Sequence, residues 1–191
     1  MGFRKNISKG LIVMTSIADV IKHRGINSAV HFTLLDNLYL ILESGFIKPR
    51  DNVDETAFLN IDAEADLIKT PDTMRFDGRT DCVNLSVSKP NIWLLRQYIQ
   101  RYKIPIEDWV ILSLTPTVFE KAGVLFCTSN AASSVCGKGD GAKGLEALFA
   151  DKVVTKRGAI HRSCEKDKNC PTDEQAEVLV PGQIPVSEIL R

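Results

Sequence analysis

The sequence carries no net charge, because its 24 Lys and Arg residues are matched by 24 Asp and Glu residues. This balance excludes a protein held to nucleic acid or to a membrane by overall charge, so binding patches must be local. No apolar run reaches the roughly 18 residues of a membrane span. The apolar part of the Met1 segment is also too short for a signal peptide. We therefore expect a cytoplasmic protein without membrane contact.

Cysteine is sparse and irregularly spaced. The chain has five cysteines, an odd number, and their spacing matches no paired zinc pattern, which indicates scattered thiols in a reducing compartment and no bound metal. The sequence also lacks a phosphate-binding loop, a dinucleotide fingerprint and the nucleophile elbow of serine hydrolases. These common enzyme signatures therefore give no guide to function.

What is present is a series of short helix and strand patterns in 191 residues, a length that suits one domain. One helix is predicted over residues 16–24, with Ser16 as N-cap and Gly25 as stop, and another over residues 91–102. The nearly continuous apolar run at residues 109–114 predicts a buried central strand. Further short strands are predicted at residues 30–34, 82–87, 124–127 and 175–180. Because these elements do not alternate as in a doubly wound sheet, the predicted class is α+β.

The first strand leads directly into a helix. Asp36 and Asn37 follow the strand and predict a capped helix start, with Gly45 as the stop. A helix N-terminus attracts anions. The polar strand residues His31 and Thr33 beside this helix start therefore predict a small pocket for a phosphate-bearing ligand.

Two polar stretches interrupt the pattern. Residues 48–79 are charged and show no sustained periodicity, which predicts a long excursion. Residues 152–173 are also polar and charged, and they predict an exposed, mobile loop. Loops of this size inside a compact domain are commonly functional or mobile.

Three polar residues lie where strands should bury apolar side chains: His31, Ser86 and Glu177. Each has a structural alternative, as a core histidine, a serine bonded to backbone, or a glutamate on a solvated face. Glu177 stands out because its neighbours favour burial and carboxylates are seldom buried without a partner. Arg75 is a fourth candidate, since a planar guanidinium suits a phosphate clamp, and Arg79 is its rival.

Three segments together resemble a known family. HFTLLDNLYLILESG resembles the opening NAD-binding segment of the DarT-type ADP-ribosyltransferase toxins. RFDGRTDCVNLSVSKPN is similar to their middle segment, an Arg-x-Asp-Gly followed by a Ser-x-Ser strand. QAEVLVPGQIP resembles their closing strand, which carries the catalytic glutamate. The segments follow the order of the family, and the resemblance extends over residues 17–189.

The resemblance implies an ADP-ribosyltransferase fold, with two facing antiparallel sheets and flanking helices around an NAD cleft, in a single domain over residues 1–191. It implies a toxin that transfers ADP-ribose from NAD to a base of single-stranded DNA and releases nicotinamide, without a metal. The implied partners are the DNA strand and a macrodomain antitoxin, and the enzyme is expected to be a monomer. The segment before Glu177 falls where this fold has its substrate-recognition loop.

The resemblance also implies roles for individual residues. Glu177 would stabilise positive charge on the ribose and accept a proton from the attacking base. Arg75 would bind and orient the pyrophosphate as a catalytic and NAD-binding group. The other NAD-binding residues would be His31, Thr33, Asn37 and Ser86. The basic residues expected to bind the nucleic-acid substrate are Lys156, Arg157, His161 and Arg162.

Several alternatives stay open at this stage. The segment NLSVSKPN resembles the guanine-modifying branch more closely than the thymidine-modifying branch. Related phage-defence toxins modify RNA, so the acceptor strand is DNA or RNA. An RNA 2′-phosphotransferase-like enzyme shares the broader fold and also uses NAD. A non-catalytic nucleic-acid-binding module would leave Glu177 as a surface residue.

Overall fold

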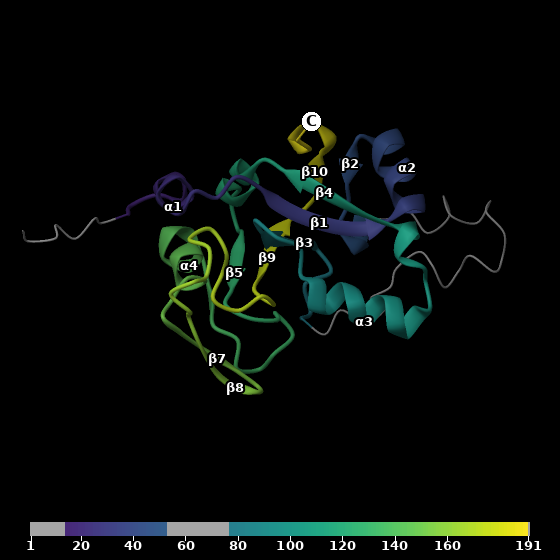
Figure 1. Cartoon of the computed structure of the whole chain (residues 1–191). Helices are drawn as coiled ribbons and strands as arrows, with labels where there is room; N and C mark the ends of the chain where they lie inside the picture. Colours follow the sequence, from purple (N-terminus) through teal and green to yellow (C-terminus); the bar gives the residue numbers. More distant parts are fainter. Residues whose placement is uncertain (1–13, 53–76, 191) are drawn as a thin grey trace, which may run out of the picture.

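A computed structural model of the chain describes residues 14–52 and 77–190 (Figure 1). The helices are α1 (Ile17–Arg24), α2 (Leu35–Ser44), α3 (Ile92–Tyr102) and α4 (Gly141–Ala147). The strands are β1 (Ala29–Leu34), β2 (Phe46–Ile47), β3 (Cys82–Val87), β4 (Trp109–Leu114), β5 (Leu125–Cys127), β6 (Lys138–Gly139), β7 (Lys152–Thr155), β8 (Gly158–His161), β9 (Glu177–Pro181) and β10 (Ile184–Pro185). In this described part, none of the helices combines the length and the apolar content needed to cross a membrane.

The main sheet is antiparallel, with strand order β4-β1-β3-β9-β5-β6. β1 pairs with β4 along its whole length, but it pairs with β3 only through Ala29 with Val87 and Val30 with Ser86. Beyond Val30 these two strands are no longer paired, so the sheet consists of two halves joined at one end and open at the other. This arrangement confirms the predicted α+β class with two antiparallel sheets around a cleft.

Strand β9 lies between β3 and β5 and is covered on both faces. Val178 and Val180 lie in the main core together with Phe126, and Leu179 packs in a smaller cluster on the other face. Burial of each such side chain stabilises the fold by about 1.5–3 kcal/mol. These apolar neighbours therefore hold the strand in the interior, and Glu177 at its start is buried with it.

Helix α3 covers the open end of the sheet, below β1 and β3 in Figure 1. Leu95 of α3 is buried against Leu34 of β1 and Trp109 of β4. The rings of Tyr98 and Phe32 meet edge to face, with their centroids 6.0 Å apart. The helix that we predicted over residues 91–102 is therefore confirmed, and it closes one side of the cleft.

The starts of the first two helices differ in how well the sequence predicts them. α1 begins after Ser16, whose side chain and that of Asp19 form a capping box, and it ends at Gly25 with φ 66°. In α2 the predicted Asp36 cap is wrong, because the helix already begins at Leu35 and has no side-chain cap. Since β1 runs into α2 without a linker, Asp36 lies inside the first turn.

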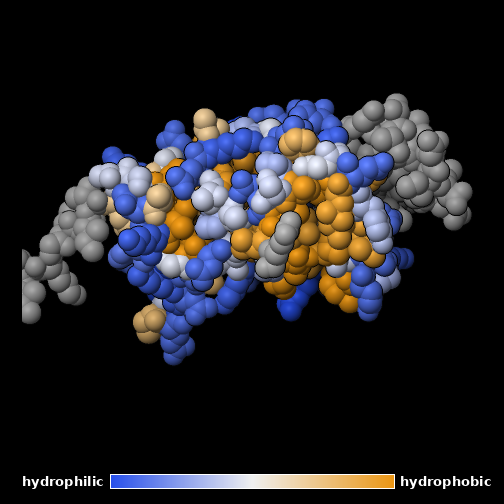
Figure 2. Space-filling model, turned by 90° about the horizontal axis from the view of Figure 1, so that it is seen from above, coloured by the Kyte–Doolittle hydropathy of each residue, from blue (hydrophilic) through white to orange (hydrophobic). Residues whose placement is uncertain are grey.

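The prediction that residues 109–114 form a central strand is also wrong, because β4 is the edge of the main sheet. Its side chains alternate: Leu112 and Leu114 are buried, whereas Ile111 is 50% exposed. Leu42 of α2 is another large apolar side chain that is exposed, and Figure 2 shows apolar surface on the side of the molecule seen from above. An edge strand with apolar side chains on both faces has the same composition as a central one, which explains the error.

The second polar stretch contains more order than predicted. Residues 152–173 are not a structureless loop, because β7 and β8 form a hairpin with Lys152 opposite His161 and Thr155 opposite Gly158. This hairpin projects below α4 in Figure 1. Of the predicted excursion, residues 53–76 lie outside the described residues, and Arg75 is among them.

Candidate active site

A hollow of about 160 Å³, here called the cleft hollow, opens between β1 and β3 where their pairing stops. His31, Ser86 and Glu177, which come from three different strands, all line it. Lys48 and Arg50, which follow β2, contribute positive charge to the same lining. The fold thus brings together a histidine from the beginning of the chain and a glutamate from its end.

Glu177 is 5% exposed and is held by backbone. Its Oε2 atom accepts a hydrogen bond of 2.8 Å from the backbone N–H of Ala131, in the loop between β5 and β6. A hydrogen bond to a charged acceptor contributes more than one between neutral groups, so it offsets part of the cost of burial. The carboxylate is therefore held in a fixed orientation.

His31 is the first residue of β1 beyond the paired end. Its Nδ1 atom lies 3.0 Å from the backbone oxygen of Asn84 on β3. Because a carbonyl oxygen only accepts, Nδ1 must carry the proton, and the neutral ring then presents Nε2 as an acceptor. Burial lowers the pKa of His31 below its usual value, although the bond to Asn84 opposes this shift. His31 is therefore uncharged near neutral pH.

Thr33 and Asn37 form a pair beside the hollow. The Nδ2 atom of Asn37 donates a hydrogen bond of 3.0 Å to Oγ1 of Thr33, which is buried. Thr33 shares a face of β1 with His31, since strand residues two apart point to the same side. Neither Thr33 nor the first turn of α2 belongs to the lining. The cleft hollow therefore does not extend to the helix start where we predicted a phosphate pocket.

Of the two candidate arginines, Arg79 lies within the described residues. It is next to the wall of the cleft hollow. It donates bonds of 2.8 and 3.0 Å to the carboxylate of Asp81. This pairing raises the pKa of Arg79 and lowers that of Asp81. The guanidinium also contacts the sulfur of Cys82, which lines the hollow, at 3.0 Å.

Lys156 and Arg157 lie at the tip of the β7–β8 hairpin and line a second hollow of about 400 Å³. The centre of the Arg157 guanidinium lies 5.2 Å from the centroid of the Trp93 ring of α3. His161 is exposed at the other end of β8, and it does not line this hollow. Of the predicted substrate-binding residues, the fold therefore groups Lys156 and Arg157.

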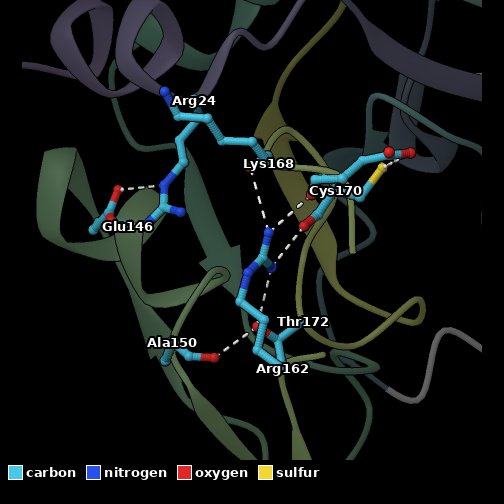
Figure 3. A network of polar contacts seen from close by, with 8 residues as sticks. Arg24, Glu146, Ala150, Arg162, Lys168, Cys170 and Thr172 are labelled. Atoms are coloured by element: carbon cyan, nitrogen blue, oxygen red, sulfur yellow. Dashed lines mark hydrogen bonds and ion pairs between the residues drawn. The ribbon is translucent and has the colours of Figure 1, made fainter. Parts of the chain in front are cut away.

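The guanidinium of Arg162 makes its hydrogen bonds to other residues of the protein (Figure 3). It donates hydrogen bonds to the backbone oxygens of Cys170 at 2.8 Å and Asp167 at 2.9 Å. It also bonds the Thr172 hydroxyl at 3.3 Å, and this hydroxyl donates to the Ala150 oxygen at 2.6 Å. Arg162 thus fixes the segment that leads into β9.

Comparison with known families decides the assignment of this fold. Residues 30–191 match the family model described as "ssDNA thymidine ADP-ribosyltransferase, DarT". The chain belongs to the DarT family. The resemblance found in the three sequence segments is thereby confirmed for most of the chain. A search of curated proteins gives no match.

Solved DarT structures share this fold at low sequence identity. The chain resembles Thermus sp. 2.9 DarT in complex with NAD+ with a TM-score of 0.54 and 17% identity, over 85% of this chain and 79% of that one. It resembles the same protein in complex with ADP-ribosylated ssDNA with a TM-score of 0.52 and 15% identity, over 86% and 79%. For Thermosipho africanus DarTG in complex with ADP-ribose the TM-score is 0.51 at 19% identity, and 85% of this chain spans only 42% of that one.

In this DarT-family chain, a side chain that sequence reasoning missed also lines the cleft hollow. Asn91 is 1% exposed, and its Oδ1 atom accepts a bond of 3.0 Å from the Leu94 N–H as the N-cap of α3. Its Nδ2 atom is buried and has no hydrogen-bond partner among the described residues. A buried donor without a partner costs about 1–3 kcal/mol. In sequence, an asparagine before a helix reads only as a cap, which hides this second donor.

Two cysteines near Glu177, Cys127 and Cys136, are in contact as free thiols, whereas we predicted scattered thiols. Cys127 lies opposite Glu177 in the β5–β9 register and contacts Cys136. The bond with the Cys136 thiol and burial raise the pKa of Cys127, while the pKa of Cys136 falls to about 6 because of the same bond. Cys127 therefore stays neutral beside the carboxylate. The described residues contain no His, Cys, Asp and Glu group suited to a metal ion.

Proposed function

We propose that this protein transfers ADP-ribose from NAD to a base of single-stranded DNA and releases nicotinamide. The observation that carries this proposal is the buried Glu177 carboxylate, fixed by the Ala131 N–H, in the same hollow as His31. Membership of the DarT family supports it, as does the likeness to Thermus DarT bound to NAD+ and to ADP-ribosylated ssDNA. A surface role for Glu177, as in a binding module without catalysis, is disfavoured because the side chain is buried.

The polar groups of the cleft hollow suit the nicotinamide end of NAD. Its volume of about 160 Å³ is below the roughly 300–1,000 Å³ of sites that enclose a whole drug-sized ligand, so it suits one end of a dinucleotide. Asn91 Nδ2 offers a donor and His31 Nε2 an acceptor for the amide or for a ribose hydroxyl. Lys48 and Arg50, with Arg75 as predicted from the sequence, would bind the pyrophosphate. Thr33 and Asn37 would hold the strand end that carries His31.

The proposed transfer depends on the positive charge that develops on the ribose. When the bond between ribose and nicotinamide breaks, its electron pair leaves with nicotinamide and positive charge develops on the ribose. The Glu177 carboxylate beside the ribose stabilises this charge more than it stabilises the ground state, in which the positive charge is on the nicotinamide ring. A ring or amino nitrogen of the base then forms the new bond to the ribose carbon, and Glu177 accepts the proton that the nitrogen loses. Ser86 lines the floor beside this reaction.

Guanine is the base that we propose as acceptor, with thymine, the base in the family description, as its competitor. The resemblance of NLSVSKPN to the guanine-modifying branch supports guanine. Lys156, Arg157 and His161 would attract the phosphates of the strand, and Arg162 would keep the recognition segment in place.

We further propose that the protein acts in the cytoplasm as a monomeric, single-domain toxin over residues 1–191, and that a macrodomain antitoxin removes the modification. The likeness to Thermosipho africanus DarTG, of which this chain spans 42%, supports a toxin–antitoxin role.

The test is incubation with labelled NAD and oligonucleotides that contain one reactive base type each, in DNA and RNA form, with mass detection. We expect addition of one ADP-ribose to guanine in single-stranded DNA. Glu177→Gln keeps an oxygen for the Ala131 N–H but loses the charge, so transfer should fall by about 10²–10³-fold, as when an electrostatic group is removed from other active sites.

Each other outcome identifies a different enzyme. Transfer that survives in Glu177→Gln would contradict the mechanism. Modification of RNA alone would place the protein with the RNA-modifying relatives, and removal of phosphate from a 2′-phosphorylated RNA would indicate a 2′-phosphotransferase. Absence of transfer to every strand would leave only a binding function.

A further inference from the structure

The second hollow, here called the Trp93 hollow, is built from four segments that are distant in sequence. Its volume of about 400 Å³ is within the range of small-molecule sites. α3 supplies Trp93, the loop between β5 and β6 supplies Asn130 and Ser133, and the β7–β8 hairpin supplies Arg157. Gln175, which precedes β9, completes this set.

One wall of the Trp93 hollow is an aromatic face with a displaceable cation on it. The indole of Trp93 is half-buried and the Arg157 guanidinium lies over its ring. The hairpin backbone at this point is held, because the N–H of Arg157 donates to the Thr155 hydroxyl at 3.1 Å and this hydroxyl donates to the Gly158 oxygen at 2.8 Å. The exposed side chain of Arg157 can therefore move while the hairpin stays in place.

A polar group in the same hollow has no partner within the described part of the chain. The hydroxyl of Ser133 is shielded from solvent, and no hydrogen bond to it is found there. A hydroxyl both donates and accepts, so a polar edge of a ligand satisfies it. Asn130 is ordered beside it, because its Oδ1 atom accepts a bond of 3.0 Å from the Ala132 N–H.

One loop, between β5 and β6, contributes to the Trp93 hollow and also contacts the Glu177 carboxylate. Asn130, Ala132 and Ser133 face the Trp93 hollow, and Ala131 between them donates its N–H to Glu177. The same loop therefore lines the Trp93 hollow and fixes the Glu177 carboxylate.

We propose that the Trp93 hollow holds a base of the single-stranded DNA strand that carries the acceptor, and that this base stacks on the indole of Trp93 and bonds with its edge to Ser133. This inference rests on the proposed function and adds a site and a residue to it. A cation over an exposed aromatic ring is worth less than a stacked base. An incoming base therefore displaces the Arg157 guanidinium, which then pairs with a neighbouring phosphate.

The test measures binding without chemistry, in the Glu177→Gln protein and without NAD. The chain has two tryptophans, so a Trp109→Phe background leaves Trp93 as the fluorescent reporter. We expect saturable quenching by a single-stranded DNA oligonucleotide, and little quenching by the same sequence as a duplex, whose bases are already stacked.

Substitutions of Trp93 then separate stacking from structure. Binding is measured by polarisation of a labelled oligonucleotide at constant salt. Trp93→Leu should weaken binding by about tenfold or more, because a stacked base contributes strongly in single-strand binding proteins. Trp93→Phe should retain most of the affinity. Ile92→Ala, a change at the neighbouring exposed residue outside the Trp93 hollow, is the matched control and should bind normally.

The outcomes distinguish this site from the proposed function. Normal binding by Trp93→Leu, or Trp93 emission that does not respond to the oligonucleotide, would overturn the site. Tighter binding of the same sequence as RNA would overturn the assignment to DNA. Binding that depends on Trp93 in a protein that transfers nothing from NAD would keep the site and remove the proposed function.

Discussion

The cleft hollow and the Trp93 hollow are built in opposite ways. In the cleft hollow, strands and a helix cap supply buried polar side chains, namely Ser86, Asn91 and Glu177. At the Trp93 hollow the charged side chains of Lys156 and Arg157 are exposed at a hairpin tip. The cleft hollow therefore holds its buried polar groups in fixed positions, whereas the charged side chains at the Trp93 hollow can change conformation.

This difference corresponds to two physical tasks. Bond breaking requires groups held in place before reaction, because a small displacement removes much of their electrostatic effect. Binding of a strand tolerates long, solvated side chains, because phosphate attraction acts over several ångströms. Substitutions in the cleft hollow should therefore alter turnover or folding, whereas those at the hairpin tip should alter affinity and its dependence on salt.

Among three further changes that test this difference, Asn91→Asp in the cleft hollow is expected to have the largest effect on activity. Asp caps a helix as well as Asn does, so the bond from the Leu94 N–H should survive and α3 should remain folded. The substitution replaces the unpartnered Nδ2 donor with an oxygen. Since a lost buried hydrogen bond costs about 1–3 kcal/mol, kcat/KM for NAD should fall by about tenfold or more.

Steady-state kinetics with varied NAD, together with thermal melting, would measure this. Asn91→Ser, which also caps the helix but introduces no charge, is the matched comparison. An unchanged KM for NAD in both variants would mean that Asn91 only caps α3.

A smaller effect is expected from the double variant Lys156→Ala, Arg157→Ala. Removal of two phosphate contacts should lower the slope of log affinity against log salt by about 1.4, from about 0.7 per charge on a single strand. The KM for the oligonucleotide should rise at low salt, and that for NAD should not. Lys152→Ala at the base of the hairpin, outside the Trp93 hollow, is the control. Equal slopes would remove the hairpin from the binding surface.

The smallest effect concerns the pH dependence of stability through His31. Burial lowers its pKa in the folded protein, so between its usual pKa and this lowered value the unfolded chain binds more protons. The contribution of His31 to stability is fully present above the usual pKa and is lost as the pH falls through the lowered one. Each tenfold difference in proton affinity between the folded and unfolded chains corresponds to about 1.4 kcal/mol.

Urea unfolding at pH 7.5 and at successively lower values down to pH 5.5 would show this loss in the parent protein. His31→Gln lacks the titrating ring, and its stability should change less over the same range. Parallel curves for the two proteins would show that His31 is not buried in its neutral form.

Local sequence signals predicted only some of these features. α1 and α3 were predictable because their caps and apolar spacing lie within a few residues, as with Ser16 and Gly25. The edge position of β4 was not predictable, because pairing partners are set by the rest of the chain. The place of Asn91 in the cleft hollow was hidden for the same reason, since other segments form that hollow.

The α+β class, the family and the identity of the polar candidates follow from the amino-acid sequence, because they depend on residue order and short-range spacing. The fold was needed to show that His31, Asn91 and Glu177 line one hollow and that Arg162 bonds to its own segment. The reason is that β1 and β3 stop pairing after Val30, and this opening depends on contacts between strands far apart in the chain.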